Sequence, residues 1–308
     1  IMIPILIGVT VLVYCLASAA PGSPVDMLMG DMASMTPESI AAMEERLGLD
    51  QPVYVQYWKW LTNMFTGNMG TSYRTGEPVW TLISQRIGPT LILTGSALLL
   101  AIIVSTLLGT LAAYKPYSVC DYLSSGLSFV GAAMPNFFVC LVFIFIFAVT
   151  LGWLPVSGMY DTLSDKNFGS LIRHLIMPCC VLALQLMGGF LRQMRSSMIE
   201  SLGHDYVNTA RSKGLKERTV VFKHSLRNSL IPLVSQIGLS LPLLVGGAVV
   251  TEQIFSWPGL GSLLVLSINA RDYPTIMGIT VIIAVVVLVG NLIVDLLYGV
   301  LDPRIRYD

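Results

Sequence analysis

The chain has 308 residues, of which 54% are hydrophobic and 12% are charged, and 18 basic residues balance 18 acidic ones. Soluble domains carry roughly a quarter charged residues, so this composition excludes an ordinary soluble globular protein and favours a membrane protein. The neutral balance also excludes the basic character typical of nucleic-acid-binding proteins, and we expect no nucleic acid partner.

The cysteines and histidines show no metal-binding or disulfide pattern. Four of the five cysteines lie in apolar runs, and Cys120 lies at the edge of one, so no extracellular disulfide framework is indicated. The three histidines lack metal-ligand spacing relative to one another or to cysteines. We therefore expect no metal site and no cofactor in this chain.

Residues 1–20 form an apolar run that is long enough to cross a bilayer. Its end, Ala17-Ser18-Ala19, imitates a signal-peptide cleavage site, so a removed leader is the alternative interpretation. No basic n-region accompanies the run, and we expect a retained first transmembrane helix.

Residues 21–86 are polar and predict a small helical extracytoplasmic segment. Pro37 follows a threonine, which is a typical helix start, and Gly48 is a typical stop. A second helix is expected after Pro52, with aromatic side chains of the kind found at the membrane–water interface. Another helix is expected to begin near Pro78.

The rest of the chain alternates apolar spans with short connections. The five spans expected there are 90–114, 123–151, 175–194, 230–250 and 274–301. With residues 1–20 they predict an all-α membrane protein with six transmembrane helices. The third span is long enough to tilt or kink around Gly131 and Pro135. We divide the chain into 1–87, the first helix with the extracytoplasmic segment, and 88–303, a five-helix membrane domain.

The loop 199–228 separates the fourth and fifth spans and concentrates positive charge. Its basic residues are Arg211, Lys213, Lys216, Arg218, Lys223 and Arg227. Basic connections are typical of the cytoplasmic side of a membrane. With six spans, this orientation predicts that both termini are cytoplasmic.

Two short amphipathic helices are expected within this loop. The first would begin at Asp205 and end at Gly214, with Tyr206, Val207 and Ala210 on a small apolar face. The second pattern places Leu215, Thr219, Phe222 and Leu226 on one side. Such helices suit docking to a cytosolic partner, and a solvated loop that only fixes topology is an equally weighted alternative.

No pattern predicts catalysis by this chain. No glycine is followed by lysine, so a phosphate-binding loop is absent and the energy for transport must come from another subunit. Asp295, with Asn291 one turn earlier, is the clear intramembrane charge. We favour a structural cap or ion pair for it over the proton relay that an ATP-independent secondary carrier would need.

Residues 246–274 form an outer, re-entrant-looking loop. It either receives substrate or is a simple hairpin that plugs the pore. Its candidate residues are Glu252, Phe255, Trp257, Pro258, Gly259, Gly261, Arg271 and Asp272.

Three stretches, 67–92, 205–232 and 246–274, together resemble the permease subunits of ABC importers, in particular the peptide/nickel (dipeptide/oligopeptide) branch. Asn208-Thr209-Ala210 followed by Gly214 resembles the Glu-Ala-Ala…Gly loop of these permeases. The chain departs from that pattern at Asn208, which stands where the family has glutamate.

The resemblance implies a type I ABC importer permease fold in the bacterial cytoplasmic membrane. It implies that 205–214 is a coupling helix that contacts the ATP-hydrolysing subunit through Asp205, Tyr206, Asn208, Thr209, Ala210, Arg211, Lys213 and Gly214. The implied partners are a second homologous permease, two cytosolic ATPases that bind ATP and Mg, and an extracytoplasmic binding protein. Di- or oligopeptides are the expected substrates, whose amino terminus would suit Glu252, and nickel or a metal chelate is the runner-up.

Overall fold

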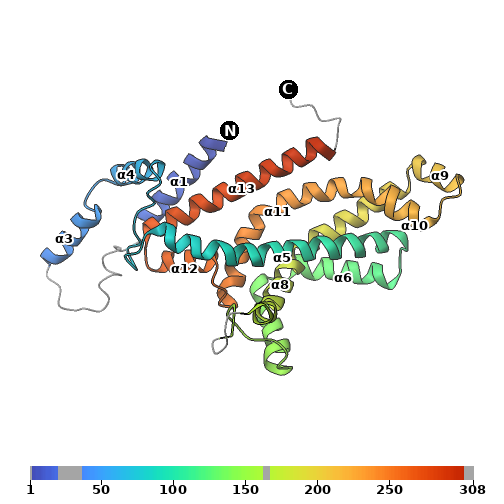
Figure 1. The fold of residues 1–308 in the computed structure, drawn as a ribbon, viewed down its shortest axis with the longest axis horizontal. Helices are drawn as coiled ribbons and strands as arrows, with labels where there is room; N and C mark the ends of the chain where they lie inside the picture. Colours follow the sequence, from blue (N-terminus) through green and yellow to red (C-terminus); the bar gives the residue numbers. More distant parts are fainter. Residues whose placement is uncertain (1, 20–36, 162–166, 302–308) are drawn as a thin grey trace. The chain divides into compact units, whose positions relative to one another are not determined.

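The computed structural model describes residues 2–19, 37–161 and 167–301, and Figure 1 shows that they are helical. Within these ranges the β-structure is limited to an isolated antiparallel bridge between Thr71 and Pro78. The threonine before Pro37 and the tail after residue 301 lie outside the described residues.

The chain clusters into two compact units. The first contains 1–89 and 258–288, and the second contains 90–257 and 289–308. Helices α5 (Val79–Tyr114) and α13 (Tyr273–Leu301) each contribute residues to both units. The unit boundary at Pro89 lies next to the predicted division at 87/88, whereas the return of 258–288 to the first unit was not predicted.

The first unit contains α1 (Met2–Ala19), α3 (Pro37–Leu47), α4 (Val53–Phe65), α12 (Leu260–Asn269) and the first parts of α5 and α13. Its core joins Val79 and Ile83 of α5 to Leu260 and Leu263 of α12 and Ile279 of α13. Burial of these aliphatic side chains holds the three helices together through the hydrophobic effect.

Helix α4 packs on α1 through polar groups as well as aromatic rings. The hydroxyls of Tyr57 and Thr10 lie 3.0 Å apart, and Tyr14 donates to Gln56 Oε1 at 3.0 Å. The rings of Tyr14 and Tyr57 meet edge to face at 5.5 Å. The predicted aromatic helix after Pro52 is therefore confirmed.

The second unit contains most of α5 and the elements that follow it. They are α6 (Val119–Ala133), α7 (Asn136–Phe143), the π-helix η1 (Ile144–Thr150), α8 (Phe168–Leu202), α9 (Asp205–Ser212), α10 (Glu217–Thr219), the π-helix η2 (Val220–Ser225) and α11 (Leu226–Ile254). Its main core lies along α8, which packs against α5, α6 and α11 and buries Phe190, Leu191, Met194 and Met198.

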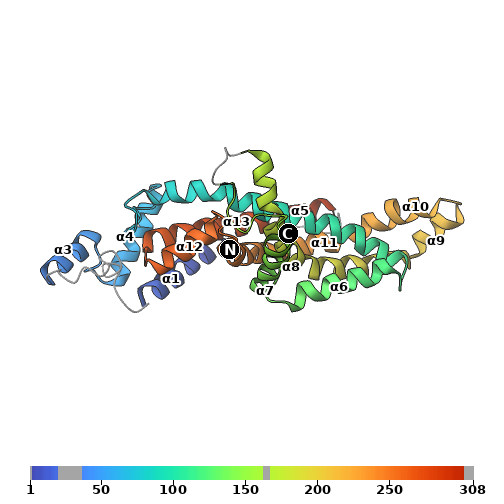
Figure 2. The same cartoon turned by 90° about the horizontal axis from the view of Figure 1, so that it is seen from below.

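Helices α6 and α8 lie side by side and approach closely at two glycines (Figures 1 and 2). A Cβ atom added at Gly131 would lie 2.1 Å from the carbonyl oxygen of Leu184, and one at Gly188 would lie 3.0 Å from the amide nitrogen of Ala132. Only glycine leaves room for the two backbones here. This kind of small-residue contact is common between transmembrane helices.

The predicted third span is sharply bent. Helices α6 and α7 meet at 116° across a break at Met134 and Pro135. The predicted position of the kink is confirmed. Its size exceeds an ordinary proline kink, because Met134 adopts extended backbone that interrupts the helix.

Each of the six predicted spans falls on helical structure. Among the described residues, three helices are long and apolar enough to cross a membrane: α5, α8 and α13 over Tyr273–Ile293. The bent α6–η1 pair meets it jointly, and α1 is a shorter apolar helix over Pro4–Ala19. Helices α5 and α8 extend well beyond the predicted limits of 90–114 and 175–194 because apolar periodicity does not mark where a membrane helix continues into water.

The glycine contact predicts a contrast between two substitutions on the same helix. Gly131→Ala should lower the free energy of unfolding by about 1–3 kcal/mol, since the new methyl group overlaps the backbone of α8. Gly126→Ala is the control, because a Cβ there meets no atom within 4 Å. Thermal unfolding in detergent should show a lower midpoint for the first variant, and equal midpoints for the two would contradict the close contact.

Candidate functional site

Helix α9 begins and ends where the sequence predicts. Its first residue is Asp205, whose negative charge suits the positive end of the helix dipole. At its end the Lys213 amide donates to the Thr209 carbonyl at 3.1 Å, and the Gly214 amide donates to the Arg211 carbonyl at 2.9 Å. Gly214 has φ +73°, a left-handed conformation that glycine adopts without steric cost.

The buried face of α9 is smaller than predicted. Val207 and Ala210 are buried together with Val220 of η2. Tyr206, the third predicted apolar residue, remains 38% exposed. Its hydroxyl lies 2.6 Å from Ser201 Oγ at the end of α8, so Tyr206 contributes a hydrogen bond where a buried hydrophobic contact was predicted.

Buried serines tie the base of this segment to α8 and α11. Ser201 Oγ donates to the Ser225 carbonyl at 3.1 Å, and Ser229 Oγ lies within bonding distance of the Ser197 carbonyl at 3.1 Å. Because Ser201 has a single proton and donates it to Ser225, the hydroxyl of Tyr206 is the donor to Ser201. These bonds connect α9, α8 and α11 at one point.

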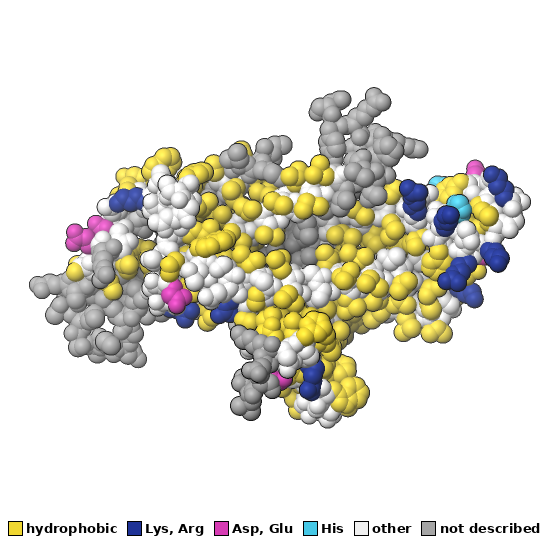
Figure 3. All heavy atoms as spheres, viewed as in Figure 1, with side chains coloured by type: hydrophobic (Ala, Val, Ile, Leu, Met, Phe, Trp, Pro, Cys, Tyr) yellow, Lys and Arg dark blue, Asp and Glu magenta, His cyan; other side chains and the backbone are white. Residues whose placement is uncertain are grey.

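The opposite face of α9 is exposed. Exposed residues there are Asp205, Asn208, Thr209, Arg211, Lys213 and Gly214. Figure 3 shows lysine and arginine side chains gathered over the α9–α10 end of the second unit. Thus seven of the eight predicted coupling residues carry exposed surface, and Ala210 is buried beneath them.

An ion pair closes the turn between α9 and α10. Arg211 donates to Glu217 at 2.7 Å and 3.3 Å. These hydrogen bonds lower the pKa of the Glu217 carboxyl and raise that of the Arg211 guanidinium. The pairing was not predicted, because the two residues are six apart across a turn. Lys213, Lys216 and Arg218 are further exposed cations near this turn.

The second predicted stripe is not the buried side of its helix. Leu215 and Phe222 are 41% and 42% exposed, whereas Val220 and Val221 are buried. Leu215 precedes α10 and is not part of a helix. For Phe222 the reason is that residues 220–225 form a π-helix, whose wider turns shift the phase of the side chains relative to an α-helix.

The predicted outer residues of the second unit are buried. Glu252 is fully buried and accepts a hydrogen bond from Thr90 Oγ1 at 2.7 Å. The carbonyl of Phe255 accepts from the Gly158 amide at 2.8 Å, and the Trp257 amide donates to the Glu252 carbonyl at 2.8 Å. In this structure Glu252, Phe255 and Trp257 therefore stabilise the C-terminal end of α11.

The predicted outer residues of the first unit lie at the start of α12 and in the turn before α13. Pro258 is half-buried, Gly259 precedes α12 and Gly261 is buried within it, and Arg271 has φ +53°. Asp272 is buried and accepts from the Ser72 hydroxyl, from the Tyr73 amide at 2.9 Å and from Thr275 Oγ1 at 2.7 Å.

Three donors thus surround the Asp272 carboxylate, which joins the 71–78 turn to α13. Burial, together with this negative charge, raises the pKa of Tyr73 to about 12. The arrangement makes Asp272 part of the scaffold of the first unit.

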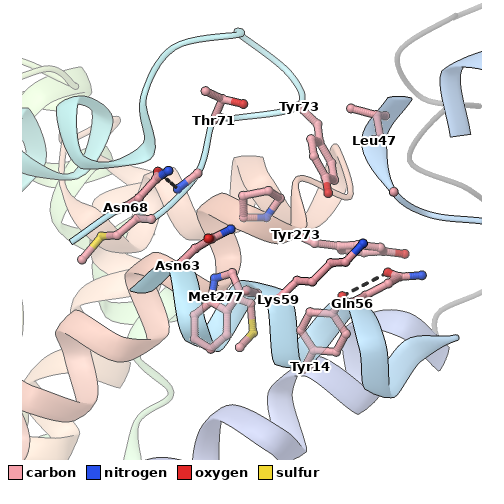
Figure 4. A pocket seen from close by; sticks show the side chains of 15 residues that line it. Tyr14, Leu47, Gln56, Lys59, Asn63, Asn68, Thr71, Tyr73, Tyr273 and Met277 are labelled. Carbon is pink, nitrogen blue, oxygen red and sulfur yellow. Dashed lines mark hydrogen bonds between the residues drawn. The ribbon is translucent and has the colours of Figure 1, made fainter. Parts of the chain in front are cut away.

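A cavity of about 270 Å³ lies beside this scaffold. Figure 4 shows Tyr14, Tyr73 and Tyr273 around it, together with Gln56 and Lys59 of α4. The Tyr14 hydroxyl donates to Gln56, and the Lys59 ammonium donates to Gln51 Oε1 at 2.8 Å, so these polar groups are engaged within the first unit.

A second cavity, of about 300 Å³, lies at the break between α6 and α7 in the second unit. Its polar lining residues come from three helices: Asn136 of α7, Gln185 of α8, and Gln236 and Ser240 of α11. No sequence pattern pointed to this place. The available signal was the presence of isolated glutamines within the predicted fourth and fifth spans.

The predicted intramembrane polar pair is described only in part. Asn291 lies on α13 and is exposed. The side chain of Asp295 lies outside the described part of the chain, so its role as a cap or a relay stays a prediction.

Comparison with known proteins gives the family. The model of the binding-protein-dependent transport system inner membrane component matches residues 105–307, and the model of the N-terminal part of such components matches residues 1–94. This chain belongs to that family. It is a multi-pass membrane protein and a transport component, as predicted, and other subunits of such systems hydrolyse ATP.

Named relatives of this permease match along nearly the whole chain. It is 47% identical to the oligopeptide transport system permease protein AppB of Bacillus subtilis, over 99% of this chain and 96% of the relative. It is 40% identical to the dipeptide transport system permease protein DppB of Alkalihalophilus pseudofirmus, over 99% and 97%.

Solved structures support the predicted ABC importer permease fold. The MetNI methionine ABC transporter in an inward-facing conformation matches with a TM-score of 0.56 at 16% identity, over 72% of this chain and 97% of that chain. An amino acid ABC transporter with histidines matches with a TM-score of 0.50 at 17% identity, over 71% and 94%.

The buried face of α9 predicts a contrast between neighbouring residues of the permease. Val207→Ser should destabilise α9 by about 1–2 kcal/mol, because it places a hydroxyl in the apolar contact with Ala210 and Val220. Hydrogen exchange of the backbone amides of 205–212 should then be roughly tenfold faster. Asn208→Ser, on the exposed face, is the control, and equal exchange in both variants would contradict the contact.

Proposed function

We propose that this chain is the membrane-spanning subunit of an ATP-driven importer that translocates di- or oligopeptides into the cytoplasm. The observation that carries the proposal is the 47% identity to an oligopeptide permease over nearly the full length of both chains. The dipeptide permease relative supports the same substrate class. Nickel or a metal chelate is the alternative cargo, taken from the sequence resemblance alone.

The exposed face of α9 is the proposed contact with a cytosolic ATPase. It offers hydrogen-bonding groups from Asn208 and Thr209 beside the cations Lys213, Lys216 and Arg218. A partner that presents acidic and polar groups in a groove would complement this surface. ATP and Mg would be bound by the ATPase, and this chain would receive the resulting movement through α9.

The remaining assembly follows the family. A second homologous permease would complete the pathway, two ATPases would dock on the cytoplasmic side, and an extracytoplasmic binding protein would deliver the peptide. With the basic 199–228 loop inside, both termini are proposed to be cytoplasmic.

The outer residues also remain candidates for the pathway. Glu252, Phe255 and Trp257 are buried in this structure. If they contact the peptide, they must become exposed when the pathway opens outward. Glu252 must likewise become exposed before its carboxylate can contact the amino terminus of a peptide.

The proposal is tested by uptake of radiolabelled tri-alanine and, in parallel, of radiolabelled nickel into proteoliposomes that contain the whole complex. The intact complex should import tri-alanine with ATP, and import of nickel alone would contradict the peptide assignment. The double variant Arg211→Glu, Gly214→Pro should abolish uptake, because it breaks the ion pair with Glu217 and proline cannot adopt φ +73°.

Two controls accompany this double variant. Lys115→Glu reverses a charge in the connection between the predicted spans 90–114 and 123–151, away from α9, and should leave uptake close to that of the intact complex. Membrane insertion of the double variant should be normal. Full uptake by a normally inserted double variant would overturn the coupling role of α9.

A further inference from the structure

We infer that the cavity at the break between α6 and α7 is a binding site for the main chain of a translocating peptide, with Gln185 and Gln236 as its ligating residues. This inference rests on the proposed function and deepens it. It names a place in the membrane part of the chain where the substrate is held.

The first observation is the interrupted backbone at the cavity. Met134 and Pro135 both line it and both lack helical backbone, and Pro135 has no amide proton to donate. Interrupted backbone at membrane depth is tolerated where it is buried in protein or lines a polar cavity. Broken helices of this kind form the substrate sites of other membrane transporters.

The second observation is that two amide side chains at this cavity are not hydrogen-bonded to any residue that the structure describes. Gln185 and Gln236 are half-buried, and neither side-chain amide makes a hydrogen bond to the described part of the chain. The nearby polar side chains are already hydrogen-bonded. Asn136 Nδ2 donates to Thr251 Oγ1 at 3.1 Å, and the Ser240 hydroxyl donates to the backbone carbonyl of Gln236 at 2.7 Å. Both side chains are only partly buried and line the cavity, so their amide groups are available to exchange water for a ligand.

The third observation is the room left around the amides. A Cβ atom at Gly189 would lie 3.2 Å from Gln236 Nε2, so a larger residue would crowd the amide. Gly131 and Ala132 line the same cavity with small side chains. Its volume of about 300 Å³ is at the lower end of the range for ligand pockets, which suits a short stretch of peptide.

The chemistry of the lining matches peptide main chain. A glutamine amide both donates and accepts hydrogen bonds, as does each peptide unit. The residues that line the cavity include no charged side chain. A neutral site of amides would recognise the repeating N–H and C=O groups and would tolerate peptides with different side chains.

The test compares uptake of tri-alanine with uptake of its backbone N-methylated analogue, which lacks amide donors, by the whole complex in proteoliposomes. The intact complex should favour tri-alanine. The double variant Gln185→Leu, Gln236→Leu should raise the KM for tri-alanine about tenfold and should lose most of the preference for it. The binding protein is the same in every sample, so a change in preference reports on this chain.

Gln193→Leu is the matched control. Gln193 lies on α8 as Gln185 does, but its amide donates to Ser197 Oγ at 3.0 Å and it does not line the cavity. It should keep the KM and the preference of the intact complex. The single variants Gln185→Met and Gln236→Met provide the same readout if the double variant does not assemble.

The outcomes separate this inference from the proposed function. If the intact complex imports no peptide, the proposed function fails. If it imports peptide and the glutamine variants keep both KM and preference, the inference is overturned while the function stands. Loss of the second permease from the purified glutamine variants would also overturn it, because the amides would then be subunit contacts.

Discussion

The packing of α11 on α8 is the constraint on which the rest of the second unit depends. The two helices contact each other extensively, and buried serines fix their register where they meet the α9–α10 segment. The hydroxyls of Ser201 and Ser229 both donate to the backbone carbonyl of Ser225, so these two buried hydroxyls are satisfied without water. Movement of one helix at this end therefore requires movement of the other or the loss of buried hydrogen bonds.

The same two helices carry both candidate sites. Helix α9 is attached to them by the contact of Val207 and Ala210 with Val220 and by the hydrogen bond from Tyr206 to Ser201. Further along, Gln185 of α8 and Gln236 of α11 face one cavity. A displacement of α9 would reach that cavity through continuous helices, and we propose this as the route that couples ATP hydrolysis in a partner subunit to the substrate.

The end of α6, which contacts α8 closely, also lines the cavity that Gln185 and Gln236 face. Gly131 and Gly188 allow the backbones to approach, and the chain then turns by 116° at Met134 and Pro135. The break in the third span thus follows directly after the contact with α8, and α8 is the helix that carries Gln185. Packing that depends on glycines is sensitive to added volume, since a methyl group at Gly131 has no place to go.

The sequence predicted those features that depend on local patterns. Apolar runs located the six spans, and an aspartate start with a glycine stop located α9, because helix caps depend on neighbouring residues. Features that depend on distant residues were missed. The π-helix at 220–225 leaves Phe222 of the predicted stripe exposed, and only the fold brings Gln185 and Gln236 to one cavity.

The same distinction applies to the outer residues. The pattern of this loop left two roles open, a receiver of substrate or a hairpin that plugs the pore. Glu252 and Asp272 are buried and accept hydrogen bonds from donors far away in the sequence, such as Thr90 and Ser72. The N-terminal part of the chain supplies these donors, and no local pattern in 246–274 indicates them.

The most direct measurement of coupling between α9 and the cavity is site-specific photo-crosslinking. Met134, which lines the cavity, is replaced by p-benzoylphenylalanine, and crosslinking to labelled tri-alanine is measured in the whole complex with and without a non-hydrolysable ATP analogue. The crosslinking yield should change with nucleotide, and this dependence should disappear when Val207→Asp detaches α9 from its apolar contact. A yield that is unaffected by nucleotide, or by the loss of that contact, would contradict the coupling of α9 to the cavity through α8 and α11.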